Sequence, residues 1–340
     1  MIGQVPLFIL VLGVTLVASL LLPFALKPVL LRLGVIDIPN ERSSHQTHVI
    51  RGVGLTVTAA ILLGLGIAFL TGLVEVDRSV LLIVALTGLS AALLGWIEDF
   101  RGLSIKRRAA FQLLIGVLGA LALAWTMDQN LLWVAVGALA IAGYINVANF
   151  MDGINGISGL HGVVVGVFYA LAGYLDDQMW LTIMGAVIAA SFAGFLPWNV
   201  GRGFVFLGDV GSYLLGGIIA ATATAAFLSG TYVEYLFFPV LIYLVDTFST
   251  LVRRIRAGET WYTSHRQHVY QRLIDSGLNH VGAALLVTAC TVVVSGCGFV
   301  AATAPPPVSV PLFFLMALIL AFYLKSPSIL ARRRVGAAES

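Results

Sequence analysis

Eleven long apolar runs constrain this chain more than any other feature of its sequence. Each is roughly 17–22 residues long, the length that a helix needs to cross a bilayer. Only 10% of the residues are charged, whereas a soluble domain carries about 25%, and the mean hydropathy is +1.00. The sequence therefore predicts an all-α polytopic membrane protein with about eleven transmembrane helices, forming a single domain over residues 1–340. The runs are 5–26, 52–73, 80–97, 109–126, 131–147, 158–175, 179–197, 211–229, 235–252, 281–303 and 310–325.

The basic residues predict how these helices are oriented. If the segments that follow the odd-numbered runs share one side of the membrane, 18 of the 19 Lys and Arg residues lie there and only Arg78 lies opposite. Because cytoplasmic segments are enriched in Lys and Arg, we expect the N-terminus outside and the C-terminus in the cytoplasm. The first run has no basic region before it and no small-residue cleavage site after it, so we expect a retained helix.

The predicted cytoplasmic segments hold nearly all of the reactive side chains, whereas the outer segments are short and carry few charges. We therefore expect a site built from the cytoplasmic loops. Their approximate limits are 27–51, 98–108, 148–158, 198–211 and 253–280.

The most informative of these loops is 146–159, which carries three Asn residues, Asp152 and three glycines between two apolar runs. A charge at the end of a span is costly without a partner, so it indicates a functional site. Asp152 and the amides offer oxygen ligands for a hard cation, and the glycines let the backbone approach a phosphate where a helix begins. An ordinary Asx-Gly turn is the alternative, but it does not explain so many amides.

Two further loops place carboxylates at span ends. Glu98 and Asp99 are adjacent and point in different directions on a helix, so one can meet a metal while the other meets a reacting group. Ion pairs with the basic cluster 106–108 are the alternative. Asp209 precedes a predicted helix in a glycine-rich turn, where a phosphate-bound cation can be held, or where Ser212 simply caps the helix.

Other side chains in these loops suit an anionic or aromatic ligand. Asn199 and Phe206 offer an amide and an aromatic face to a base. The segment 264–272 holds two His and two Arg, which suits phosphate binding, while a zinc site is weakly supported because no Cys or His-Glu-x-x-His spacing accompanies it. In the first loop, Arg42 and His45 either face an anion or belong to a solvated basic loop.

Together these loops predict phosphoryl transfer at the inner membrane face. Mg²⁺ is usually held by one or two carboxylates plus substrate phosphates, and such reactions depend on positioning and charge neutralisation. A soluble diphosphate and a lipid acceptor would both reach such a site. The residues alone name neither the sugar, the base nor the lipid.

The motifs in these loops resemble a known family, the polyprenyl-phosphate N-acetylhexosamine-1-phosphate transferases of glycosyltransferase family 4, which are related to phospho-MurNAc-pentapeptide translocase. The last motif resembles the branch that initiates O-antigen. The matching stretches occur in family order and cover every long cytoplasmic loop. They are Asp37-Ile-Pro with Arg42 and His45, Gly95 to Leu103, Asn146 to Gly159, Phe206 to Ser212, Asp246-Thr247, and His265 to Leu273.

The resemblance implies a reaction of a UDP-N-acetylated sugar with undecaprenyl phosphate, giving the lipid-linked diphosphate sugar and UMP, with Mg²⁺ or Mn²⁺ as cofactor. It implies a bacterial cytoplasmic membrane enzyme that acts on membrane lipid, does not bind nucleic acid and is compatible with a homodimer. Asp209 and Asp152 are the implied metal ligands. The implied catalytic residues are Glu98, Asp99, Asp152, His265 and His268, and the implied substrate-binding residues are His45, Asn149, Asn155, Asn199, Phe206, Asp246 and Arg266.

Two positions depart from the family pattern. Glu98-Asp99 stands where Asp-Asp is usual, which lengthens one side chain by a methylene, and Asn155 stands where a second Asp is usual. The alternatives are a phospho-MurNAc-pentapeptide transferase, disfavoured by the His265–His268 motif, and an ion-coupled transporter. A transporter should place acids near the bilayer midplane, whereas only Asp246 falls inside a run, near its inner end.

Overall fold

The computed structural model describes residues 5–37, 49–200, 205–259 and 266–338. They form a helical bundle, and every predicted apolar run falls on helix. Within the described ranges, ten helical segments are long and apolar enough to cross a membrane, and α2 is a shorter apolar helix of 17 residues, so the predicted all-α membrane fold is confirmed. The orientation in the membrane stays a prediction.

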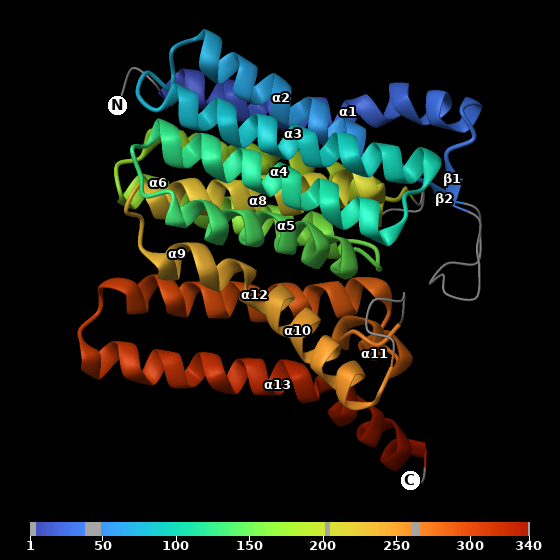
Figure 1. The fold of residues 1–340 in the computed structure, drawn as a ribbon. Coiled ribbons are helices and arrows are strands. Elements are labelled where there is room, and N and C mark those ends of the chain that lie inside the picture. Colours follow the sequence, from blue (N-terminus) through green and yellow to red (C-terminus); the bar gives the residue numbers. More distant parts are fainter. Residues whose placement is uncertain (1–4, 38–48, 201–204, 260–265, 339–340) are drawn as a thin grey trace.

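The first eight helices form the main bundle (Figure 1). They are α1 (Val5–Arg32), α2 (Gly54–Leu70), α3 (Arg78–Arg101), α4 (Ile105–Thr126), α5 (Leu132–Met151), α6 (Ile157–Leu175), α7 (Met179–Val200) and α8 (Gly208–Leu228). In the described part of the chain, strands are limited to β1 (Ile36–Asp37) and β2 (Val49–Ile50), an antiparallel pair in which Ile36 faces Ile50.

The last helices pack against one side of this bundle (Figure 1). The ninth predicted run is interrupted: α9 (Val233–Phe237) leads through a 3₁₀ turn (Phe238–Val240) into α10 (Leu241–Arg256). Pro239 lies in that turn, and proline has no N–H to donate to a continuing helix. The short α11 (Val269–Asp275), α12 (His280–Thr303) and α13 (Pro306–Ala338) complete the chain.

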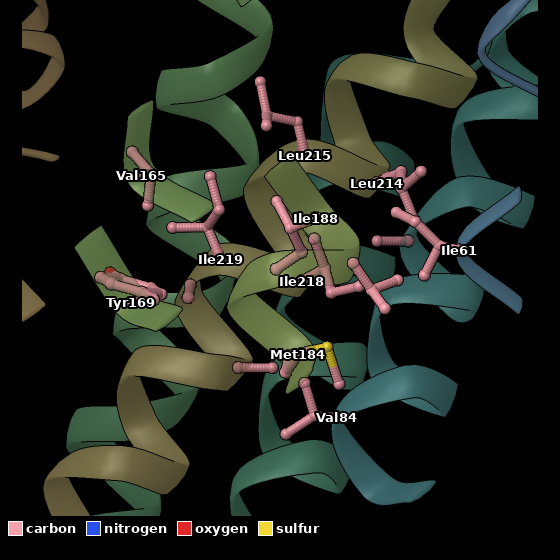
Figure 2. Packing of buried hydrophobic residues seen from close by; sticks show 14 of the residues in the cluster. Ile61, Val84, Val165, Tyr169, Met184, Ile188, Leu214, Leu215, Ile218 and Ile219 are labelled. Atoms are coloured by element: carbon pink, nitrogen blue, oxygen red, sulfur yellow. The ribbon is translucent and has the colours of Figure 1, made fainter. Parts of the chain in front are cut away.

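Helix α8 is the centre of the main bundle. In an apolar 18-residue stretch of α8, 83% of the residues are buried. The corresponding shares are 17% in α1 and 11% in α13, because these two helices face outward. Figure 2 shows Leu214, Leu215, Ile218 and Ile219 of α8 surrounded by side chains of neighbouring helices. Because lipid tails are as apolar as leucine, close packing rather than water exclusion holds such helices together.

Small residues allow this close packing. A Cβ added to Gly88 of α3 would lie 3.0 Å from Ile218 Cβ of α8, and one added to Gly166 of α6 would lie 2.5 Å from the Ala189 nitrogen of α7. The main bundle is therefore a tight scaffold. A second hydrophobic cluster joins α10–α13 to residues at the α5–α6 junction, so the two parts of the fold meet beside the 146–159 loop.

Candidate active site

The predicted site residues gather at one end of the bundle, where α3, α5 and α7 end and α4, α6 and α8 begin. Figure 1 shows α11 and the β1–β2 pair at this same end. The segment before α8 is tied to the first loop, since the Phe206 N–H donates to Ile50 O at 3.0 Å and the Gly54 N–H donates to Leu207 O at 2.9 Å. Loops that are far apart in sequence thus meet around the start of α8.

Asp209 lies in the first turn of α8 and is held by its neighbours. Asn149 Nδ2 donates to Asp209 Oδ1 at 2.7 Å and to Ser212 Oγ at 3.1 Å. The preceding Gly208 has φ +75°, and an added Cβ would lie 2.7 Å from both Asp99 Oδ2 and the Gly52 nitrogen. Only glycine fits both the left-handed backbone and this close approach, so the turn places Asp209 in one defined position.

Asp99 caps α8 from another helix. Its Oδ1 accepts the Asp209 N–H at 3.1 Å, and its Oδ2 accepts the Val210 N–H at 3.0 Å. The first N–H groups of a helix have no partner within the helix, and a carboxylate there also interacts favourably with the helix dipole. Asp99 therefore holds the Asp209 segment in place, while its catalytic role stays a prediction.

Glu98 is placed differently from its neighbour. Its Oε1 lies 3.5 Å from Arg108 Nη1 at the start of α4, so an ion pair with the basic cluster does form. Its Oε2 is buried and has no hydrogen-bond partner among the described residues. A buried carboxylate oxygen left unpaired is costly, so this atom marks a place where a ligand, proton or water belongs.

Asp152 ends α5 and turns back toward α6. Ser158 Oγ donates to its Oδ1 at 2.7 Å. Burial, and to a smaller extent the nearby Asp209 carboxylate, raise the pKa of Asp152 to about 7 against the opposing effects of the Ser158 hydrogen bond and Arg51. Asp152 and Asp209 are thus close enough to repel each other. A bound cation would relieve that repulsion.

Asp152 and Asp209 suit Mg²⁺ better than a metal ion whose ligands all come from the protein. Among the residues that the structure describes, no three His, Cys, Asp or Glu side chains form a metal-binding group. Mg²⁺ commonly takes one or two carboxylates and completes its coordination with water and substrate phosphates. The donor set therefore suits a hard divalent ion bound together with a diphosphate.

Asn199 connects two parts of the site through its side chain. Its Oδ1 accepts the Gly156 N–H at 2.6 Å, and its Nδ2 donates to Val205 O at 3.0 Å. With the residue only 6% exposed, the amide ties the 152–156 turn to the segment before α8. Asn155 in that turn is also buried, and its backbone N–H lies 3.5 Å from His280 Nδ1.

The last predicted motif lies against the same turn. The Tyr270 hydroxyl donates to Phe150 O at 2.9 Å and contacts Gly153, where a Cβ would collide with it. His268 is buried with its ring stacked near Phe150, at a centroid distance of 6.2 Å, and its Nδ1 lies 3.0 Å from Asp246 Oδ1. Asp246 is fully buried, so its contact with a substrate would run through His268.

Two other predicted residues are more exposed. Arg266 is exposed, and Phe206 is half-buried beside the start of α8. His45 and His265 lie outside the described residues, as does Arg42.

The structure adds residues that the sequence did not single out as site residues. Ser158 is a direct partner of Asp152, and Arg108 is a direct partner of Glu98. Tyr323, on the last helix, donates to Asp246 Oδ2 at 2.6 Å. Arg108 belongs to the basic cluster 106–108, which was expected only as an alternative ion-pair partner of Glu98 and Asp99. No local pattern distinguishes Tyr323 from the apolar run around it.

The sequence is also similar to known proteins. Residues 81–227 match the family described as glycosyl transferase family 4. Over 297 residues the chain is 30% identical to a decaprenyl-phosphate N-acetylglucosaminephosphotransferase of Mycobacterium leprae, covering 75% of this chain and 74% of that relative. This chain belongs to glycosyl transferase family 4.

Two other relatives are similar over even more of the chain. The decaprenyl-phosphate N-acetylglucosaminephosphotransferase of Mycobacterium tuberculosis is 29% identical over 322 residues, 81% of this chain and 78% of that protein. The undecaprenyl-phosphate alpha-N-acetylglucosaminyl 1-phosphate transferase of Yersinia pestis is 27% identical over 332 residues, 91% of this chain and 89% of that protein. The family match itself spans Glu98 to Asp209 but ends before Asp246 and His268.

Proposed function

We propose that this chain transfers an N-acetylhexosamine 1-phosphate from a UDP-sugar to undecaprenyl phosphate and releases UMP. One observation carries the proposal: the named relatives are N-acetylglucosamine phosphotransferases of decaprenyl or undecaprenyl phosphate, and each covers about three quarters or more of this chain. The clustering of Glu98, Asn149, Asp152 and Asp209 at one end of the bundle supports it.

The chemistry balances as a substitution at phosphorus. An oxygen of the lipid phosphate attacks the phosphorus that carries the sugar, a new P–O bond forms, and the bond between that phosphorus and the UMP oxygen breaks. UMP leaves with the electron pair of the broken bond. If the lipid phosphate still carries a proton, Glu98 would accept it through Oε2, which has no hydrogen-bond partner in the described part of the chain.

Asp209 and Asp152 would hold Mg²⁺ or Mn²⁺ with the donor diphosphate. When bound, such an ion neutralises charge on the diphosphate and on the leaving UMP. The chain's own part is to keep the carboxylates in place, with Asn149 and Asp99 fixing Asp209 and Ser158 fixing Asp152. This arrangement suits a reaction in which positioning and electrostatics dominate.

The remaining predicted residues would bind the donor or shape its site. Asn149, Asn155 and Phe206 lie around the turn and the start of α8, where a nucleotide would approach. Arg266 and His268 would bind the diphosphate. Asn199 and Asp246 are engaged with the protein, so we assign them to holding these segments.

We place the enzyme in the bacterial inner membrane with its site facing the cytoplasm, since UDP-sugars are cytoplasmic metabolites and 18 of the 19 Lys and Arg residues fall on that predicted side. A lipid-linked cell-surface glycan such as O-antigen would begin with this product. The five site segments would act as parts of one domain. A homodimer is compatible with the outward-facing α1 and α13.

The test is UMP release by purified protein with undecaprenyl phosphate, Mg²⁺ and a panel of UDP-N-acetylhexosamines. UDP-MurNAc-pentapeptide is included, and a known family member serves as control. We expect UMP from an N-acetylhexosamine donor, only when both lipid and metal are present. If UDP-MurNAc-pentapeptide is the one donor that gives UMP, the enzyme is a phospho-MurNAc-pentapeptide transferase. If no donor gives UMP while the control enzyme is active, the proposal is overturned.

A further inference from the structure

Asp246 is the centre of a hydrogen-bond cluster that joins α10, α11 and α13. One oxygen, Oδ1, accepts from His268 Nδ1 and from the Val269 N–H, each at 3.0 Å. The other, Oδ2, accepts from the Tyr270 N–H at 3.3 Å and from the Tyr323 hydroxyl at 2.6 Å. Two of these donors are backbone amides at the start of α11, so Asp246 fixes that short helix as well as the His268 ring.

Tyr323 is an unusual residue for its position. Helix α13 is mostly exposed to the membrane, with 11% of its apolar window buried, yet Tyr323 is 0% exposed. Its hydroxyl makes the shortest contact in the cluster. Hydroxyl–carboxylate hydrogen bonds of this length are among the stronger ones in proteins, and a bilayer offers no water to replace a lost partner.

The contact between Asp246 and His268 sets the chemistry of the imidazole. A carboxylate oxygen only accepts, so the proton between the two groups is carried on His268 Nδ1. With Nδ1 bound to Asp246, the imidazole ring is held in one orientation. The orientation of His268 therefore depends on where Asp246 lies, and Tyr323 anchors Asp246 from the opposite side.

We propose that Tyr323 is a positioning residue for the active site, acting through Asp246 on His268. This rests on the proposed function, because His268 is assigned there to the donor diphosphate. Tyr323 lies on the last helix, after every motif described above and outside residues 81–227, which match the family. The residues that support the active site would therefore extend to that helix. The competing explanation is that Tyr323 only stabilises the packing of α13 against α10.

A double-mutant cycle separates these explanations. Tyr323→Phe, Asp246→Asn and the double variant are compared for UMP release, with kcat and the KM for the UDP-sugar measured separately. We expect Tyr323→Phe to lower kcat about tenfold, as removal of a residue supporting an active-site histidine does elsewhere, and to change KM less than about twofold. Asp246→Asn should cost about a hundredfold or more, and Tyr323→Phe should add nothing in its background.

Tyr169→Phe is the matched control. Tyr169 is equally buried, but its hydroxyl donates to a backbone oxygen, Leu236 O, at 3.0 Å rather than to Asp246. We expect its kcat to stay within about twofold of wild type. An unchanged kcat in Tyr323→Phe, or a tenfold loss that persists on top of Asp246→Asn, would overturn the proposal.

A second measurement is independent of the reaction. In ¹⁵N-histidine NMR of the full chain, His268→Gln identifies the His268 signals among the six histidines. We expect Tyr323→Phe to shift those signals while Tyr169→Phe leaves them unchanged. If the wild-type protein releases no UMP, the proposed function fails, but the spectra still decide whether Tyr323 acts on His268. Unchanged His268 signals in Tyr323→Phe would overturn the inference.

Discussion

The carboxylates of the site differ in what surrounds them, and this decides their roles. Asp209 is held by a neutral amide donor, Asn149, whereas both Asp99 oxygens are used by backbone N–H groups. Glu98 keeps one buried oxygen without a partner among the described residues. The two adjacent acids are therefore engaged differently: Asp99 holds the start of α8, whereas Glu98 pairs with Arg108 through its other oxygen.

Replacing Asp209 by Asn tests the metal assignment. The amide is nearly isosteric but carries no charge, so we expect the rate of UMP release to fall at least about a hundredfold while the protein stays folded in the membrane. Asp177→Asn is the control, since Asp177 is exposed in another loop and its φ of 54° is one that Asn tolerates. A near-normal rate in Asp209→Asn would remove this residue from the metal site.

The raised pKa of Asp152 predicts a pH dependence. Because the folded-state pKa is about 7 and the ordinary value for an aspartate is 3.8, the metal-free protein holds a proton at Asp152 between those values that the unfolded chain lacks. Protonation of Asp152 therefore stabilises the folded state. This stabilisation is fully present below about 3.8 and is lost as the pH rises through about 7. A metal must displace the same proton, so its affinity should fall toward tenfold per pH unit below about 7.

Mg²⁺ titration by calorimetry between pH 5.5 and 8 measures this dependence. Asp152→Asn, which has no proton to lose, should bind more weakly at pH 8 and show a much flatter profile. A profile equally steep in both proteins would assign the titration to another group.

At the scale of elements, the start of α8 is tightly constrained by its neighbours. An alanine at position 208 would need a φ of +75° and would push its Cβ against Asp99 Oδ2 and the Gly52 nitrogen. We expect Gly208→Ala to destabilise the protein by about 1–3 kcal/mol and to reduce UMP release at least about tenfold, because Asp209 is displaced.

Gly66→Ala is the control for this substitution. An alanine Cβ at position 66 of α2 has no heavy atom within 4 Å, apart from its chain neighbours and the local helix backbone. We therefore expect little change in the unfolding temperature or the rate. Equal behaviour of the two variants would contradict the packing described for the α8 turn.

For the whole molecule, the orientation in the membrane is a testable consequence of the charge distribution. Cys290 and Cys297 are buried, and both are replaced by Ala before Asp128→Cys or Gly258→Cys is introduced. An impermeant maleimide should label position 128 in intact cells but position 258 only after the membrane is disrupted. The reverse pattern would move the proposed site to the outer face.

The sequence by itself determined the class of the protein. Apolar runs of membrane-spanning length leave the backbone little choice but helix, because no water is present in the bilayer core to satisfy unpaired N–H and C=O groups. The motifs around Asp152 and Asp209 also predicted a functional site, since glycines, amides and acids are unusual at span ends. The break of the ninth run at 238–240 was not predicted, because a single proline inside an apolar run is compatible with a kinked helix as well as a broken one.

Only the tertiary structure decided which of these residues face one another. Asp99 meets the start of α8, Asn199 bridges two loops, and Tyr323 reaches Asp246 across 77 residues of sequence. The periodicity of an apolar run predicts that a helix forms, but a membrane helix that is apolar on all sides carries little information about its rotation. That rotation is fixed by close packing against neighbouring helices, and it therefore exists only in the assembled bundle.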